Sequence, residues 1–389
     1  MLKSELGSLD QHLVFGLESL DVPPKLLARA MAVYDDLGAW VLKHDASVGR
    51  KEPSFFPQGS AALGTTTITN GDWDIDAVYE RPLARISTTQ DQLKDEAGKV
   101  LESFRDDQRR QDKPVPRIEK RDRCWRLVYR GFHIDALPAI PEDVNDEVSN
   151  RLLISDKELR EWIVTDPKGY KAWFIERMGQ VFEEERQALA KSSQRTVEEV
   201  PVWEVKSVLQ RTVQYVRRDR DLSYGDDPED LSPASILVTT LVARCYQGEQ
   251  SIAEALRGVA DRIRDHLHMK DGELWVSNPT DDHLPEDERE NLARAMVGDS
   301  RRAARFELWI RSLCDDLLGL RDAKGQGLRK LIAKSIGEGQ MVSAEERIAT
   351  LRTEQRDTGS LRMAAGTGTL GAIGAKAVPR HTNDGDPQE

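Results

Sequence analysis

The sequence predicts an α+β protein in which a strand-rich N-terminal lobe with a mixed sheet faces an all-helical lobe across a cleft. Two observations lead to this fold class. In the first part of the chain, short segments alternate apolar and polar residues with the period of two that strands require. Beyond about residue 156, apolar residues recur at helical spacing instead. The length of 389 residues suits two such lobes. We therefore place the first lobe at 1–150, the helical lobe at 151–335 and a tail at 336–389.

The N-terminal lobe opens with a helix, because an apolar stripe follows Pro23-Pro24. We expect its last strand to bend at Gly131 and to end at the prolines that follow. The elements expected in order are a helix over 25–48, a turn at Gly59-Ser60, a strand over 73–79, a helix over 90–109 and strands over 118–120 and 124–137.

The second lobe is predicted to be built from helices, with a short extended piece and turn over 274–279 between them. The helices are expected over 169–191, 203–221, 234–246, 251–266, 286–298, 300–318 and 320–334. After about residue 359 the chain is rich in Gly, Ala and Thr and then in Pro, Asn and Asp, with almost no large apolar residues. Such a composition cannot bury a core, so we expect this part of the tail to be largely disordered.

Three carboxylates on predicted strands are the most informative feature of the chain. Strand alternation puts Asp74 and Asp76 on one face and their apolar neighbours on the other. The same alternation separates Asp135 from Ile134 and Ala136. Carboxylate oxygens are the ligands that Mg²⁺ prefers, and a pair of Mg²⁺ ions can activate a hydroxyl and neutralise a leaving pyrophosphate. The pattern predicts a site for metal-bound nucleoside triphosphate.

The bulk composition excludes several other classes of protein. The formal net charge is −12, which argues against a general nucleic-acid binder. The three cysteines are scattered and none stands in a zinc-binding spacing. No apolar run reaches the length of a membrane span, and the N-terminus lacks the apolar segment of a signal peptide. We expect a cytoplasmic protein that does not associate with a membrane.

These residues resemble the polymerase-β-like nucleotidyltransferase superfamily, and within it the bacterial CD-NTases (cGAS/DncV-like nucleotidyltransferases) of CBASS anti-phage systems. The resemblance spans roughly residues 20–320. The segments that carry it are 58–67, 71–76, 132–139, 166–174, 235–241 and 277–279. It implies a polymerase-β-like catalytic lobe beside the helical lobe, with two Mg²⁺ ions, or Mn²⁺ in their place, bound by Asp74, Asp76 and Asp135.

The resemblance also implies contacts to the nucleotide. Gln58, Gly59 and Ser60 would hold the triphosphate. A phosphate-contacting lysine of the family would correspond to Arg217, and Ser235 to a nucleotide-contacting position. Arginine can bind phosphate through two parallel hydrogen bonds, whereas lysine is a point charge. Arg211 competes for this role, and a solvated helix end is the other interpretation of both arginines.

The implied activity is synthesis of a cyclic di- or trinucleotide second messenger from ATP and from GTP, CTP or UTP. A downstream effector would bind the product, and a partner protein would control the enzyme. The absence of a Cys/His cluster and the acidic charge argue against direct activation by DNA. The alternative is a transferase that adds nucleotides to RNA 3′ ends or AMP to a protein, although no sustained basic stripe is visible. A third hypothesis, a catalytically inactive binding module, conflicts with the intact trio of acids.

Overall fold

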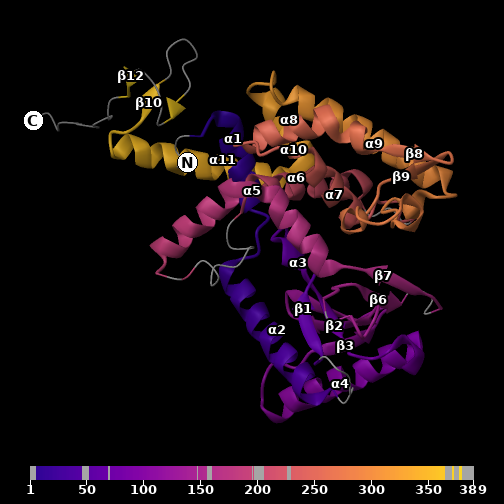
Figure 1. Cartoon of the computed structure of the whole chain (residues 1–389). Coiled ribbons are helices and arrows are strands. Elements are labelled where there is room, and N and C mark those ends of the chain that lie inside the picture. The colour runs from indigo at the N-terminus through magenta and orange to yellow at the C-terminus, as the bar shows by residue number, and fades with distance from the viewer. Residues whose placement is uncertain are drawn as a thin grey trace, which may run out of the picture.

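The computed structural model describes two lobes, one built on a mixed sheet and the other from helices (Figure 1). The long helix α5, Pro167–Ser192, lies between them in this view and changes direction at Gly179, which has a φ of 70°. A positive φ is unfavourable for other residues, so glycine permits the break. The structure describes residues 6–45, 52–68, 71–146, 148–155, 160–194, 196, 206–225, 229–363, 370–371 and 376–378.

The main sheet has the strand order β1-β2-β5-β4-β3, and β6 and β7 extend it from the end of β5. Strands β2 and β5 pair in parallel, whereas the other pairs are antiparallel, so the sheet is mixed as predicted. The strands are β1 (Ser54–Pro57), β2 (Asp74–Glu80), β3 (Arg117–Lys120), β4 (Trp125–Tyr129), β5 (Phe132–Pro141), β6 (Leu152–Ser155) and β7 (Trp162–Thr165).

The structure corrects two details of the predicted strand-rich lobe. The expected strand over 124–137 is two antiparallel strands, β4 and β5, because Arg130-Gly131 forms the loop of a hairpin. Gly131 has a φ of 88°, a conformation that glycine adopts readily and other residues do not. The sheet also continues past residue 150, where we expected the first lobe to end, because β6 and β7 pair with β5 and with each other.

One face of the sheet is covered by helices α2 (Pro24–His44) and α4 (Gln90–Arg110). The apolar side chains of β2 and β5, such as Ile75 and Ile134, pack there against Leu37 and Leu101. This confirms the predicted alternation: the apolar residues of both strands face the helices, and the intervening acids are only partly buried or exposed. The sheet therefore presents its carboxylates on the uncovered face.

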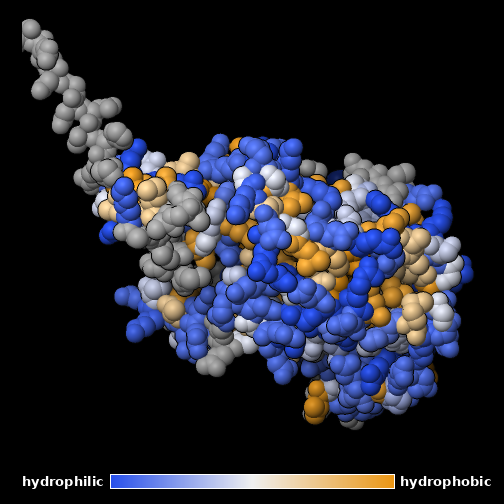
Figure 2. All heavy atoms as spheres, turned by 90° about the horizontal axis from the view of Figure 1, so that it is seen from above, coloured by the Kyte–Doolittle hydropathy of each residue, from blue (hydrophilic) through white to orange (hydrophobic). Residues whose placement is uncertain are grey.

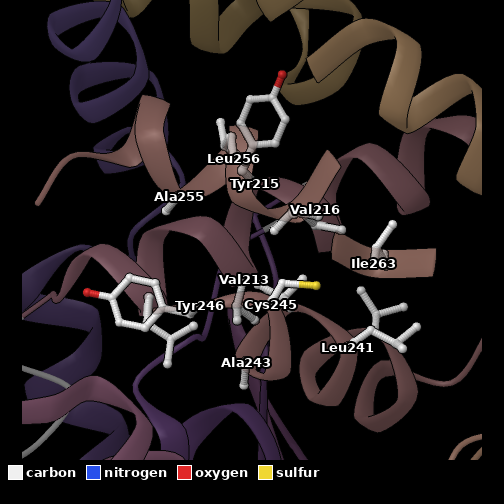
Figure 3. Packing of buried hydrophobic residues seen from close by; sticks show 14 of the residues in the cluster. Val213, Tyr215, Val216, Leu241, Ala243, Cys245, Tyr246, Ala255, Leu256 and Ile263 are labelled. Carbon is white, nitrogen blue, oxygen red and sulfur yellow. The ribbon is translucent and has the colours of Figure 1, made fainter. Parts of the chain in front are cut away.

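A second core holds the helical lobe together. Figure 3 shows its centre, where Tyr215 and Val216 of α6 lie near Leu241 of α7 and Leu256 of α8. The helices are α1 (Ser8–Glu18), α3 (Gly59–Leu63), α6 (Val208–Tyr224), α7 (Ser235–Cys245), α8 (Ile252–Arg262), α9 (Ser300–Gly319), α10 (Gln326–Ile336) and α11 (Glu338–Asp357). The lobe is not wholly helical, since β8 (His268–Lys270) pairs with β9 (Glu273–Trp275). The helix expected over 286–298 is replaced by two short 3-10 turns, Glu286–Glu288 and Arg294–Met296.

The end of the chain contains more structure than its composition predicts. Strands β10 (Arg362–Met363), β11 (Leu370–Gly371) and β12 (Lys376–Ala377) form a small antiparallel sheet, so the expected disorder is wrong for these residues. The other residues beyond 363, apart from 378, lie outside the described ones. Viewed from above, the surface is mainly hydrophilic with hydrophobic groups scattered among the polar side chains (Figure 2). None of the helices in the described ranges has the length and apolarity to cross a bilayer.

Candidate active site

The three predicted carboxylates come together on the two parallel strands of the sheet. Asp74 and Asp76 lie on β2, and Asp135 lies on β5. In the register of this pair, Asp76 stands directly opposite Asp135, and Asp74 stands opposite His133. The His133 ring contacts Asp72 through Nε2, at 2.7 Å from the Asp72 carboxylate. The acids share the face of the sheet that α2 and α4 leave uncovered, which is the arrangement expected from strand alternation.

The electrostatics of these acids indicate a site that requires positive charge. Burial, and after it the neighbouring Asp135 and Asp74, raise the pKa of Asp76 to about 6, against the influence of Arg217 and Arg126. Burial also raises the pKa of Asp74. Carboxylates this close repel each other when ionised, and a cation between them relieves the repulsion.

The oxygen ligands of this site suit a hard divalent cation, but the side chains are not arranged around a common point. The carboxylate oxygens on this face are the ligands that Mg²⁺ prefers, and His133 shares the face as the register partner of Asp74. Within the described ranges, no three acidic, histidine or cysteine side chains are placed to coordinate one ion. The reason is visible at Asp135, whose two oxygens are engaged by an arginine.

That arginine, Arg126 on β4, is the residue that the sequence analysis missed. Its Nε donates to one oxygen of Asp135 at 2.7 Å and its Nη2 to the other at 2.6 Å. Nη2 also lies 3.8 Å from Asp74. Arg126 and Asp135 are direct partners in the β4–β5 register. Recognising the Arg130-Gly131 hairpin in the sequence would have placed them opposite each other.

The predicted phosphate turn lies against the carboxylates. The Gln58 backbone N–H donates to the Asp76 carbonyl at 2.8 Å, which continues the pairing of β1 with β2. Gly59 has a φ of 57°, and a Cβ added there would lie 2.7 Å from the Asp76 carboxylate. Only glycine therefore fits between the turn and Asp76 without displacing that side chain. Ser60 follows, and its hydroxyl accepts from the Thr66 hydroxyl at 3.3 Å.

A row of side chains along one face of helix α6 forms hydrogen bonds to the loop that follows this turn. Lys206, just before the helix, donates to the Gly64 carbonyl at 2.6 Å. Gln210 donates to the Leu63 carbonyl at 2.8 Å, and Gln214 donates to the Thr66 carbonyl at 2.9 Å. Both glutamines are fully buried. The helical lobe thereby fixes the backbone beside Ser60.

Arg217 is the next residue of this row, and it is poised for an anionic ligand. Its Nη1 lies 3.4 Å from the Thr65 hydroxyl, and its charge acts on Asp76. Its buried Nε has no hydrogen-bond partner among the described residues. Burial lowers the pKa of this guanidinium. A buried cation with an unused donor is costly unless a partner such as phosphate binds.

Arg211, the rival candidate, is engaged elsewhere. Its guanidinium donates to Asp21 at 2.9 and 2.7 Å and to the Leu17 carbonyl at 3.3 Å. Ser235 lies exposed at the start of α7, and its hydroxyl accepts from Arg220 at 3.0 Å. The recorded contacts of Ser235 connect α7 to α6 rather than to the carboxylates.

A large cavity of about 1200 Å³ lies behind β2 and is separate from the carboxylates. It is lined by Trp73 and Ile75, which alternate with Asp74 and Asp76 along the chain. This cavity therefore lies on the opposite side of β2 from the candidate chemistry.

An Asp-x-Asp strand, a third Asp on the parallel neighbouring strand and a preceding Gly-Ser turn define the chain as a nucleotidyltransferase. Residues 53–138 match the family "Cyclic GMP-AMP synthase DncV-like, nucleotidyltransferase domain". Residues 53–138 are therefore similar to a DncV-like nucleotidyltransferase domain, and together with the mixed sheet and the helical lobe this match supports a CD-NTase with a polymerase-β-like α+β fold.

Two curated relatives are similar to this chain in sequence, and a solved structure is similar to it in fold. The chain is 27% identical over 364 residues to the c-di-GMP synthase of Roseivirga ehrenbergii, covering 92% of each protein. It is 25% identical over 283 residues to the cyclic dinucleotide synthase CdnG of Bradyrhizobium diazoefficiens, covering 66% of this chain and 64% of that protein. The structure of CdnG in complex with GTP shares the fold, with a TM-score of 0.64 at 21% identity, over 88% of this chain and all of CdnG (100%).

Proposed function

We propose that this chain joins two nucleoside triphosphates into a cyclic dinucleotide, with GTP as a principal substrate. The observation that carries the proposal is the placement of Gly59 directly against Asp76, with Asp135 opposite. This arrangement would bring a triphosphate on the turn and a group activated at the carboxylates into contact. The names of the two relatives, a c-di-GMP synthase and a cyclic dinucleotide synthase, support a dinucleotide product.

In each of two rounds, a ribose hydroxyl attacks the α-phosphate of a triphosphate and pyrophosphate leaves. The second round closes the ring, so two triphosphates yield one cyclic dinucleotide and two pyrophosphates. Asp74, Asp76 and Asp135 would hold Mg²⁺, or Mn²⁺ in its place. The bound ions would favour the deprotonated hydroxyl and neutralise charge on the phosphates.

The other proposed contacts belong to the turn and to the helical lobe. The Gly59 backbone allows close approach of the phosphates, and the Ser60 hydroxyl and Gln58 flank them. Arg217 would offer its unused donor to a phosphate oxygen. We retain Ser235 as a nucleotide contact of the α7 start, where it is exposed. The strand-rich lobe would thus bind metal and triphosphate, and the helical lobe would orient the nucleotide.

The biological setting follows from the CD-NTase group. We propose a cytoplasmic enzyme of CBASS anti-phage defence whose product is bound by a downstream effector and whose activity is controlled by a partner protein. A transferase that modifies RNA 3′ ends or attaches AMP to a protein remains the alternative activity.

Incubation of the purified protein with labelled ATP, GTP, CTP and UTP, singly and in pairs with Mg²⁺, tests the proposal. We expect a phosphatase-resistant product whose mass, measured by mass spectrometry, is that of a cyclic dinucleotide containing guanine. Asp76→Asn should abolish it, whereas Asp261→Asn, the same change on the surface of α8, should not. Label found only on added RNA or protein would refute the proposal.

A further inference from the structure

Arg126 forms an ion pair with Asp135, the third carboxylate of the site, and this pair differs from a simple ion pair on the surface. The guanidinium is 24% exposed and Asp135 is 14% exposed, so both partners of the pair are largely removed from solvent. Two parallel hydrogen bonds join them, the strongest geometry available to an arginine and a carboxylate. The hydrogen bonds to Asp135 raise the pKa of Arg126, so the arginine stays charged.

The position of Arg126 is fixed by the sheet. It is the cross-strand neighbour of Asp135, and residues directly opposite on antiparallel strands have their side chains in contact. The same guanidinium reaches 3.8 Å from Asp74. Arg126 therefore lies between two of the three acids, in the region where a cation shared by these acids would bind.

We propose that Arg126 is the counter-ion of the metal-free site and releases Asp135 when a divalent cation binds, so that it lowers the affinity of the site for metal. The inference rests on the proposed function, because it takes Asp135 as a metal ligand. Arg126 acts through Asp135 and is a positioning residue.

The competition follows from the electrostatics of the three acids. Without Arg126, Asp74, Asp76 and Asp135 would face one another with Arg217 acting on Asp76 and His133 acting on Asp74. A carboxylate oxygen held by an arginine N–H has given up a lone pair that a metal could use. A metal at Asp135 would therefore compete with Arg126 for these oxygens and would place a second cation beside the guanidinium, so we expect the Arg126 contact to weaken on metal binding.

The test compares Mn²⁺ binding to the full chain and to Arg126→Gln by isothermal titration calorimetry without nucleotide. We expect Arg126→Gln to bind Mn²⁺ roughly two- to fivefold more tightly, which corresponds to the upper part of the range that a partly exposed ion pair contributes. Arg117→Gln is the matched control, because Arg117 lies on the same sheet and pairs with Glu119. Its Mn²⁺ affinity should equal that of the unaltered chain.

Thermal melting supplies a readout that is independent of activity. In EDTA, Arg126→Gln should melt below the unaltered chain, since its acids lack their counter-ion, and Mn²⁺ should raise its melting temperature by more. Arg126→Lys keeps the charge without the two-point contact and should bind Mn²⁺ with intermediate affinity. If the glutamine variant does not fold, the lysine variant decides the question.

The outcomes separate this inference from the proposed function. Unchanged or weaker Mn²⁺ binding in the Arg126 variants would overturn the inference, while product formation that depends on Asp76 would leave the proposed activity intact. Mn²⁺ binding that Asp76→Asn does not affect would overturn both the metal site and the inference. Tighter binding in both Arg126 variants supports the release of Asp135 on metal binding.

Discussion

At the scale of single residues, repulsion among the three carboxylates of the site should affect the stability of the protein. Burial, Asp135 and Asp74 raise the pKa of Asp76 from 3.8 to about 6. A carboxyl whose pKa is higher in the folded than in the unfolded state favours folding below its unfolded pKa. That contribution is lost as the pH rises through about 6. The metal-free protein should therefore lose stability between about pH 4 and pH 6 from this group.

Asp76→Asn should remove this penalty. In EDTA at pH 7.5 we expect the free energy of unfolding to rise by about 3 kcal/mol, the order of magnitude that the raised pKa of Asp76 implies. At pH 4 the gain should vanish, because Asp76 is then protonated in the folded protein. Denaturant unfolding at both pH values measures the difference, with Asp261→Asn as the control. An equal gain at both pH values would show that packing, and not charge, is responsible.

At the scale of elements, helix α6 connects the helical lobe to the phosphate turn. Gln214 holds the Thr66 carbonyl, and the Thr66 hydroxyl in turn contacts Ser60. Because Gln214 is fully buried, replacing its amide leaves the Thr66 carbonyl without a partner. An unsatisfied buried polar group costs about 1–3 kcal/mol.

Gln214→Leu should therefore affect both stability and nucleotide binding. We expect it to lower the free energy of unfolding by about 1–3 kcal/mol. It should also raise the KM for the triphosphate by more than it changes kcat, because the turn that binds phosphate loses its support. Gln187→Leu, on an exposed position of α5, is the matched control for urea unfolding and steady-state kinetics. If Gln214→Leu is destabilised but its KM for the triphosphate is unchanged, then the role of α6 is structural only.

The strands also show which features could be predicted from the sequence and which could not. Alternation within one strand was sufficient to put Asp74 and Asp76 on one face, because it depends only on neighbouring residues. The contact of Arg126 with Asp135 depends on register between two strands, which one turn determines. Interpreting 124–137 as one bent strand hid that register, although Arg130-Gly131 between apolar residues was a usable hairpin signal.

At the scale of the whole molecule, segments far apart in the sequence pack together in shared hydrophobic clusters. Helix α1 contributes Leu13 and Leu17 to the core of the helical lobe, although it precedes the sheet in sequence. On another side, Phe15 of α1 packs against Ala344 and Ile348 of α11. Such contacts could not be predicted from the sequence, since local periodicity shows that a helix has an apolar face but not which distant helix covers it. The composition of the last residues likewise did not predict the β10–β12 sheet.

Helix α11 should consequently be part of the folded unit. A chain that ends after Ile336 loses Met341, Ala344 and Ile348, which are almost fully buried, and exposes Phe15. Burying one large apolar side chain contributes about 1.5–3 kcal/mol, so we expect the melting temperature to fall by about 5–10 °C. A chain that ends after Val378 keeps α11 and the β10–β12 sheet and should melt within about 1 °C of the full chain. Calorimetry of both truncated proteins distinguishes the two cases. Equal melting temperatures would mean that α11 adds no packing energy, and that the helical lobe is complete at Ile336.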